Sequence, residues 1–297
     1  MRSLAMLSYL LILMMVLLYT FQSVFCKQYA KYYPGDPSHA TPVFTIVGGI
    51  VVAVVSFFFS GMTFSASPLT LLLGVANAIT LYCYNYSVIQ CTRNGSYSVL
   101  MVFSVAGGII LPAIFARIVF GDDLSLLGIL FILLIIASVY MVSSKSGASK
   151  ITRKFLMYCF LLAFFNGVYG ILLDVQQRLT GVEEKEEMVT ATFLMAAIFS
   201  LVTLLFRRAN IPAAMKQTKI SFVYLMAYAI VAALAVNLLV LIIPLVNVTI
   251  LYTMDNAGVM LLSVLCSCIF YKEKLSPLNI VGCILMAFGL AGMALFA

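Results

Sequence analysis

The sequence predicts an all-α integral membrane protein whose ten transmembrane helices form two inverted five-helix repeats around a central cavity. Two observations predict the membrane class: 64% of the 297 residues are hydrophobic and only 9% are charged, against roughly 25% in an average soluble domain. A soluble fold of this length cannot bury so much apolar surface, which excludes soluble enzymes and soluble nucleic-acid binders. A third observation, an internal repeat, predicts the arrangement of the helices.

The predicted spans are apolar stretches of about the 20 residues that a membrane helix needs. Those of the first half lie near 4–26, 42–60, 68–91, 97–120 and 124–143, and those of the second near 155–177, 189–206, 220–243, 247–270 and 276–296. The first stretch is longer than the apolar region of a signal peptide and lacks a small-residue cleavage site, so we expect it to remain as a helix. The connections are short, and segments such as 34–37 and 210–212 carry turn residues.

The polar break at 143–154 divides the chain into a first repeat at 1–146 and a second at 147–297. A gapless shift of 151 residues places Ala106-Gly107 on Ala257-Gly258, and Leu124-Ser125 on Leu275-Ser276. The same shift places Ser104 on Asp255, Asp122 on Glu273 and Lys27 on Arg178. A unit with five spans ends on the opposite side of the membrane, so the second copy must be inverted. Inverted repeats with a site near the midplane are typical of secondary transporters.

Nearly the whole chain resembles the drug/metabolite transporter superfamily, specifically its ten-helix EamA-like members. The resemblance rests on the five-plus-five helices, on an acidic residue before Leu-Ser at the start of the last helix of each half (121–125 and 272–276), and on the glycine spacing of the final helix at Gly282, Gly289 and Gly292. It implies a basket of helices around a central cavity, lined by the third, fourth, eighth and ninth helices together with the first and sixth. The loop 60–68 lacks the basic residues usual in the family.

Basic residues predict the orientation of the chain. Most of the 17 Lys and Arg residues lie in the loops after the first, third, fifth, seventh and ninth spans. By the positive-inside rule, both termini are then outside the cytoplasm. The family usually has both termini inside, and the sequence leaves these two orientations open.

Two acids within the spans are candidates for proton or ion coupling, because a charge at a helix centre costs roughly 2.5–3.5 kcal/mol on insertion. Asp255 lies close to mid-bilayer in the ninth span and has no base near it in sequence. The alternative is a buried carboxylate satisfied by tyrosines, by Arg93 or by Arg117. Asp174 lies one turn from the end of the sixth span, where Arg178 is at the right spacing for an ion pair.

Polar side chains recur at helical spacing on the third, fourth, sixth and ninth spans. Because an unpaired amide or hydroxyl in hydrocarbon is costly, we expect these faces to converge on a polar, tyrosine-rich cavity. The alternative is hydrogen bonding between packed helices without any ligand. The candidate substrate-binding residues are Asn77, Tyr84, Tyr97, Ser104, Asn166, Tyr169, Gln177, Tyr252, Asp255 and Asn256.

These features predict a secondary transporter for a small polar or amphipathic metabolite, such as an amino acid, an amine or a drug-like compound, with proton coupling through Asp255. The alternatives are a facilitative channel and a lipid-handling protein with a polar groove. The chain has no phosphate-binding loop and no catalytic or metal-ligating cluster, so we expect no enzyme activity, cofactor or metal. We expect a multi-pass protein of a prokaryotic plasma or inner membrane that contacts lipid and a small-molecule substrate but no nucleic acid, as a monomer or a homodimer.

Overall fold

The computed structural model describes residues 2–121, 125–144, 152–180, 184–242, 245–246 and 248–296, and every regular element in these ranges is helical. The first half holds α1 (Arg2–Tyr32), α2 (Pro37–Phe59), α3 (Pro68–Asn94), α4 (Tyr97–Phe115), the π-helical turn η1 (Ala116–Phe120) and α5 (Leu126–Ser144). The second half holds α6 (Arg153–Thr180), α7 (Lys185–Phe206), α8 (Ile211–Met215), α9 (Lys219–Ile242), α10 (Val248–Tyr271) and α11 (Pro277–Phe296).

Seven helices in the described ranges are long and apolar enough to cross a membrane: α1, α2, α3, α4 with η1, α6, α7 and α9. The described residues also contain three shorter apolar helical segments, Leu126–Val142, Asp255–Tyr271 and Pro277–Gly292, which belong to α5, α10 and α11. Large apolar side chains face outward along the bundle, for example Leu72 at 66% exposed and Phe160 at 64%. Such a surface is suited to lipid rather than water, so the chain is a multi-pass membrane protein.

Capping residues explain where several helices begin. Asp36 precedes Pro37 at the start of α2, and its carboxylate accepts the backbone N–H of Ser38 at 2.7 Å. Asn210 accepts the N–H of Ala213 at 3.2 Å and starts the short helix α8. The turn residues at 210–212 thus also begin a short helix, because an Asn cap followed by a proline in the first turn favours the start of a helix.

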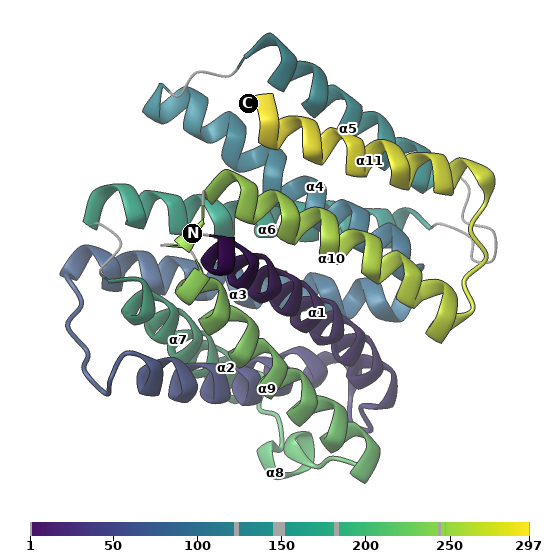
Figure 1. Cartoon of the computed structure of the whole chain (residues 1–297). Coiled ribbons are helices and arrows are strands. Elements are labelled where there is room, and N and C mark those ends of the chain that lie inside the picture. The colour runs from purple at the N-terminus through teal and green to yellow at the C-terminus, as the bar shows by residue number, and fades with distance from the viewer. Residues whose placement is uncertain are drawn as a thin grey trace.

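Helices of the two halves interleave in the bundle. Figure 1 shows α1 crossing the middle of the molecule, where it packs against α9 and α10 from the second half and also contacts α3. In turn, α6 packs against α3 and α4 of the first half, and α2 packs against α7. The pair α5 and α11 lies side by side at one edge. Neither half therefore forms a bundle that is separate from the other.

The glycines of α11 are used for packing within the chain. Side chains of α5 occupy the space that a Cβ would need at each of three positions: Val142 at Gly282, Ile135 at Gly289 and Phe131 at Gly292. Because α5 covers this glycine stripe, the spacing of the glycines serves close helix packing within the chain.

Gly107 in α4 and Gly167 in α6 allow these two helices to approach closely. A Cβ on Gly107 would lie 2.0 Å from the backbone oxygen of Ala163, and one on Gly167 would lie 2.6 Å from the backbone oxygen of Gly107. Gly107→Ala is therefore expected to push α4 from α6 and to lower the free energy of unfolding by about 1–3 kcal/mol. Thermal unfolding in detergent measures this loss.

Gly170→Ala is the matched control on the same helix pair. Its Cβ would meet only the ring atom Cγ of Pro112, at 3.3 Å, which is a tight contact but not a backbone clash. Alanine also favours the helix by roughly 0.5–1 kcal/mol over glycine, so this variant should be about as stable as the native chain. Equal melting temperatures for Gly107→Ala and the native protein would contradict the close packing of α4 on α6.

Candidate functional site

Several predicted site residues meet in the interior of the bundle, where α3, α4, α6 and α10 face one another. The amide of Asn166 donates to the backbone oxygen of Ser104 at 2.7 Å, and Tyr84 contacts the Ser104 side chain. A Cβ on Gly108 would lie 2.7 Å from Nδ2 of Asn166 and 4.0 Å from Oδ1 of Asn256. The absence of a side chain at Gly108 thus leaves room for the Asn166 amide. We call Tyr84, Ser104, Asn166 and Asn256 the central polar group.

Asp255 lies one residue before Asn256 on α10. It is partly buried, and its Oδ1 atom is buried without a hydrogen-bond partner among the residues that the structure describes. Arg93, which sequence reasoning offered as a base for Asp255, instead lines a pocket at the C-terminal end of α3 with Lys27 and Glu273. An ionised carboxylate that lacks a partner is costly in this setting, so a proton or a cationic ligand would stabilise Asp255.

The other predicted binding residues are more dispersed. Asn77 is fully buried two helical turns before Tyr84, and neither of its amide atoms has a hydrogen-bond partner in the described part of the chain. Tyr169 packs against a buried cluster of α3 and α7 that includes Leu81. Gln177 is partly buried near the end of α6. The side chain of Tyr252 lies outside the described residues.

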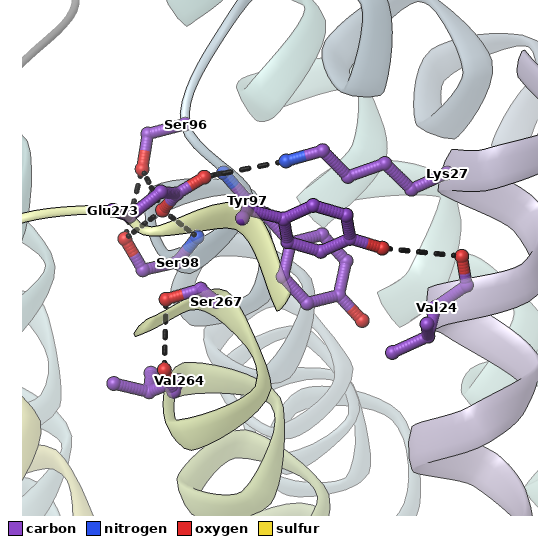
Figure 2. A network of polar contacts seen from close by, with 9 residues as sticks. Val24, Lys27, Ser96, Tyr97, Ser98, Val264, Ser267 and Glu273 are labelled. Atoms are coloured by element: carbon purple, nitrogen blue, oxygen red, sulfur yellow. Dashed lines mark hydrogen bonds and ion pairs between the residues drawn. The ribbon is translucent and has the colours of Figure 1, made fainter. Parts of the chain in front are cut away.

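Tyr97 lies with a polar cluster at one end of the bundle, which Figure 2 shows and which we call the Glu273 cluster. Glu273, in the loop between α10 and α11, accepts the backbone N–H groups of Tyr97 at 2.7 Å and Ser98 at 3.2 Å. It also accepts the hydroxyls of Ser96 at 2.8 Å and Ser98 at 3.1 Å. Lys27 of α1 forms an ion pair with it at 3.2 Å. One carboxylate thus joins α1, the start of α4 and the α10–α11 loop.

The charges of the Glu273 cluster compensate one another. Burial by itself raises the pKa of Glu273, but the N–H of Tyr97, the charge of Lys27 and the hydrogen bonds at Ser96 and Ser98 together hold it below its ordinary value. A helix N-terminus also favours negative charge, which adds to this effect. The Lys27 ammonium lies over the rings of Tyr271 at 3.8 Å and Tyr97 at 5.1 Å.

A second polar cluster lies at the opposite end of the bundle. Glu184, which precedes α7, accepts the backbone N–H of Ser67 at 3.1 Å and its hydroxyl at 2.8 Å, at the start of α3. Hydrogen bonds from Thr70 and Ser67 hold the pKa of Glu184 below its ordinary value. Thr70 also donates to Thr180 at 3.3 Å, so this cluster ties α3 to α6 and α7.

Asp174 lies near this second end, and the predicted ion pair with Arg178 is confirmed, with 3.0 Å between the carboxylate and Nε. The Arg178 guanidinium lies 4.3 Å from the centre of the Phe120 ring. Both partners are about one-third exposed, so the pair is at a partly open position. A role of Asp174 in ion coupling stays a prediction.

The sequence patterns did not predict that Lys27, Glu273 and Glu184 would join helices at the ends of the bundle. A signal was present for the first two, because the internal repeat aligns Lys27 with Arg178 and Glu273 with Asp122. This alignment does not show that Glu273 contacts α4 and Lys27, because these residues belong to distant parts of the sequence. Glu184 belongs to a run of acids before an apolar helix, which is typical of a solvated loop.

The architecture defines a class, the multi-pass helical membrane protein with helices of two halves interleaved. No protein-family model and no curated protein matches the chain. Its fold is similar to that of 28 chains of known structure. One, described only as "Crystal structure of protein", has a TM-score of 0.67 and 13% identity, and the match covers 98% of this chain and 97% of that chain. At this identity the likeness shows the fold alone, over nearly the whole chain.

Proposed function

We propose that the protein is a secondary transporter that moves a small polar or amphipathic metabolite by alternating access. In this proposal all ten long helices span the membrane, and they form two inverted five-helix repeats. Each half supplies equivalent helices to one central path, so an exchange of their conformations opens the opposite end of the path.

The single observation that carries the proposal is the symmetry of the helix contacts. Exchanging the halves pairs α1 with α6, α2 with α7, α3 with α9, α4 with α10, and α5 with α11. Under this exchange the contact α1–α9 becomes α6–α3, α1–α10 becomes α6–α4, and α2–α9 becomes α7–α3, and each of these contacts is present. The contacts α2–α7, α5–α11 and α4–α10 map onto themselves.

Two of the cation–ring contacts, Lys27 over Tyr271 and Arg178 over Phe120, follow the same symmetry. Lys27 and Arg178 differ by 151 positions, and so do the rings beneath them, Tyr271 and Phe120. They lie at opposite ends of the bundle, one in the Glu273 cluster and one beside Asp174. Equivalent polar contacts at the two ends support a mechanism in which each end closes in turn around the central polar group.

The substrate class follows from the central polar group and its acid. Amides, tyrosines and the unpartnered carboxylate oxygen of Asp255 suit an amino acid, an amine or a drug-like cation. Competition between the substrate and a proton for Asp255 would couple their movements. The basic end that contains Lys27 is the cytoplasmic end by the positive-inside rule.

A thermal-shift screen of the purified protein against a metabolite library at two pH values tests the proposal. A substrate at 100 times its dissociation constant stabilises the native state by roughly 2.7 kcal/mol, so it should raise the melting temperature measurably. Uptake of each hit into liposomes should then saturate with concentration. Flux that stays linear would support a channel instead. No hit, together with movement of labelled lipid between leaflets, would support a lipid-handling protein.

A further inference from the structure

A pocket of about 540 Å³ lies at the basic end of the bundle, between the C-terminal parts of α1 and α3 and the end of α10. The side chains that line this pocket carry more positive than negative charge. Three cations and one carboxylate are among its lining residues, which include Lys27, Lys31, Thr92, Arg93, Tyr271 and Glu273.

The carboxylate of this pocket is already neutralised by Lys27, which also lines the pocket. Glu273 forms its ion pair with Lys27 and accepts two backbone N–H groups at the start of α4. Lys31 and Arg93 form no ion pair within the described ranges of the chain. Lys31 lies at the exposed rim, 5.1 Å from the centre of the Tyr32 ring. Two positive charges therefore face the pocket without a negative partner.

Arg93 is the less accessible of the two. Its Nη1 atom is buried and has no hydrogen-bond partner among the residues that the structure describes. A guanidinium is always charged in proteins, and a buried donor without an acceptor is costly. Its planar set of donors matches the oxygens of a carboxylate or a phosphate. Because Arg93 lines the pocket, an oxyanion bound there would balance its charge.

We propose that this pocket binds an oxyanion, a phosphate or carboxylate group, with Arg93 as the anchor and Lys31 as the second cation. The site is separate from the central polar group and does not depend on the proposed transport. Two sources share the required chemistry: a soluble anion from the cytoplasmic side and the headgroup of an anionic phospholipid. Basic pockets between helices on that side are suited to either.

Inorganic phosphate is the first probe, titrated against the purified protein in detergent with sodium chloride added to constant ionic strength. The melting temperature should rise with phosphate and reach a plateau. Arg93→Gln should weaken the apparent affinity at least tenfold, and Lys31→Gln should weaken it several-fold. Lys219→Gln removes an exposed cation at the same end and should leave the affinity unchanged. Lys31→Gln keeps the test valid if Arg93→Gln does not fold, because Lys31 is exposed.

The lipid source is tested in nanodiscs of phosphatidylglycerol or phosphatidylcholine. A stabilising effect specific to phosphatidylglycerol, lost in Arg93→Gln or Lys31→Gln but not in Lys219→Gln, would support the site with a headgroup as its occupant. A response to free phosphate with the same pattern would support it with a soluble anion. If neither probe stabilises the protein, or if all the variants respond as the native chain does, the proposal is overturned.

Discussion

Asp255→Asn is expected to abolish uptake driven by a proton gradient while leaving exchange of substrate across the membrane intact. Asparagine keeps the size of the side chain but cannot gain or lose a proton. The free energy of a proton gradient, about 1.4 kcal/mol per pH unit, can then no longer be coupled to the substrate. With one proton per substrate, a gradient of one pH unit supports about tenfold accumulation in the native protein, and this accumulation should disappear in the variant.

The measurement is uptake of a substrate from the library screen into liposomes under an imposed pH gradient. Asp174→Asn is the matched control, because Asp174 is also an acid within a helix but forms an ion pair with Arg178 at 3.0 Å. If Asp255 is the coupling acid, Asp174→Asn should accumulate substrate as the native protein does. Unchanged accumulation by Asp255→Asn would remove Asp255 from the coupling mechanism, and a loss confined to Asp174→Asn would transfer the role to Asp174.

Glu273→Gln is expected to lower the free energy of unfolding by about 2–5 kcal/mol, which is typical when one partner of a buried, hydrogen-bonded charge pair is removed. The side chains of Glu273 and Lys27 are only 16% and 15% exposed, so the charge left on Lys27 is poorly solvated. The glutamine side chain also replaces one carboxylate oxygen with an NH₂ group. This donor would face the Ser96 hydroxyl or the backbone N–H groups at the start of α4, which need an acceptor. Lys274→Gln, an exposed change one residue away, should have little effect.

A double-mutant cycle isolates the ion pair within this loss. If Lys27→Met and Glu273→Gln remove the same interaction, their combined cost is smaller than the sum of the single costs. Additive losses would show that Glu273 acts through α4 alone.

The pH dependence of unfolding gives an independent check on Glu273. Because the pKa of Glu273 is below its ordinary value in the folded protein, its stabilisation is complete above the unfolded pKa near 4.3 and is lost as the pH falls through the folded pKa. Melting curves in detergent between about pH 6 and pH 3 should therefore show a steeper acid loss for the native chain than for Glu273→Gln. If the stability of the native chain and of Glu273→Gln fell equally with pH, Glu273 would not be the source of the acid loss.

Local sequence features predicted the helices better than they predicted the contacts between them. Runs of apolar residues located the long helices, but the second span was predicted to begin near residue 42, whereas α2 begins at Pro37 after the Asp36 cap. Arg178 was correctly paired with Asp174 because both lie on one helix at a spacing of four residues. The close contact of Gly107 with Ala163 joins α4 to α6, and no local pattern identified this partner.

The candidate site was predicted unevenly for the same reason. Tyr84, Ser104 and Asn166 were selected by periodicity, and the structure brings them together. Tyr97 was selected by the same rule, yet it lies in the Glu273 cluster at the start of α4. Helical spacing shows which side chains share a face, but it does not show at which depth along the helix a neighbouring helix meets that face.

The sequence by itself determined the membrane class, the approximate limits of the helices and the acids that need an explanation, because hydropathy and spacing act over short stretches of chain. Only the tertiary structure decided that Glu273 closes on Lys27 and on the start of α4, that Arg93 faces a pocket instead of Asp255, and that the glycines of α11 pack on α5. These outcomes depend on side chains up to 246 positions apart in sequence. The packing of whole helices brings such residues together, and no local sequence pattern predicts which distant residues will be in contact.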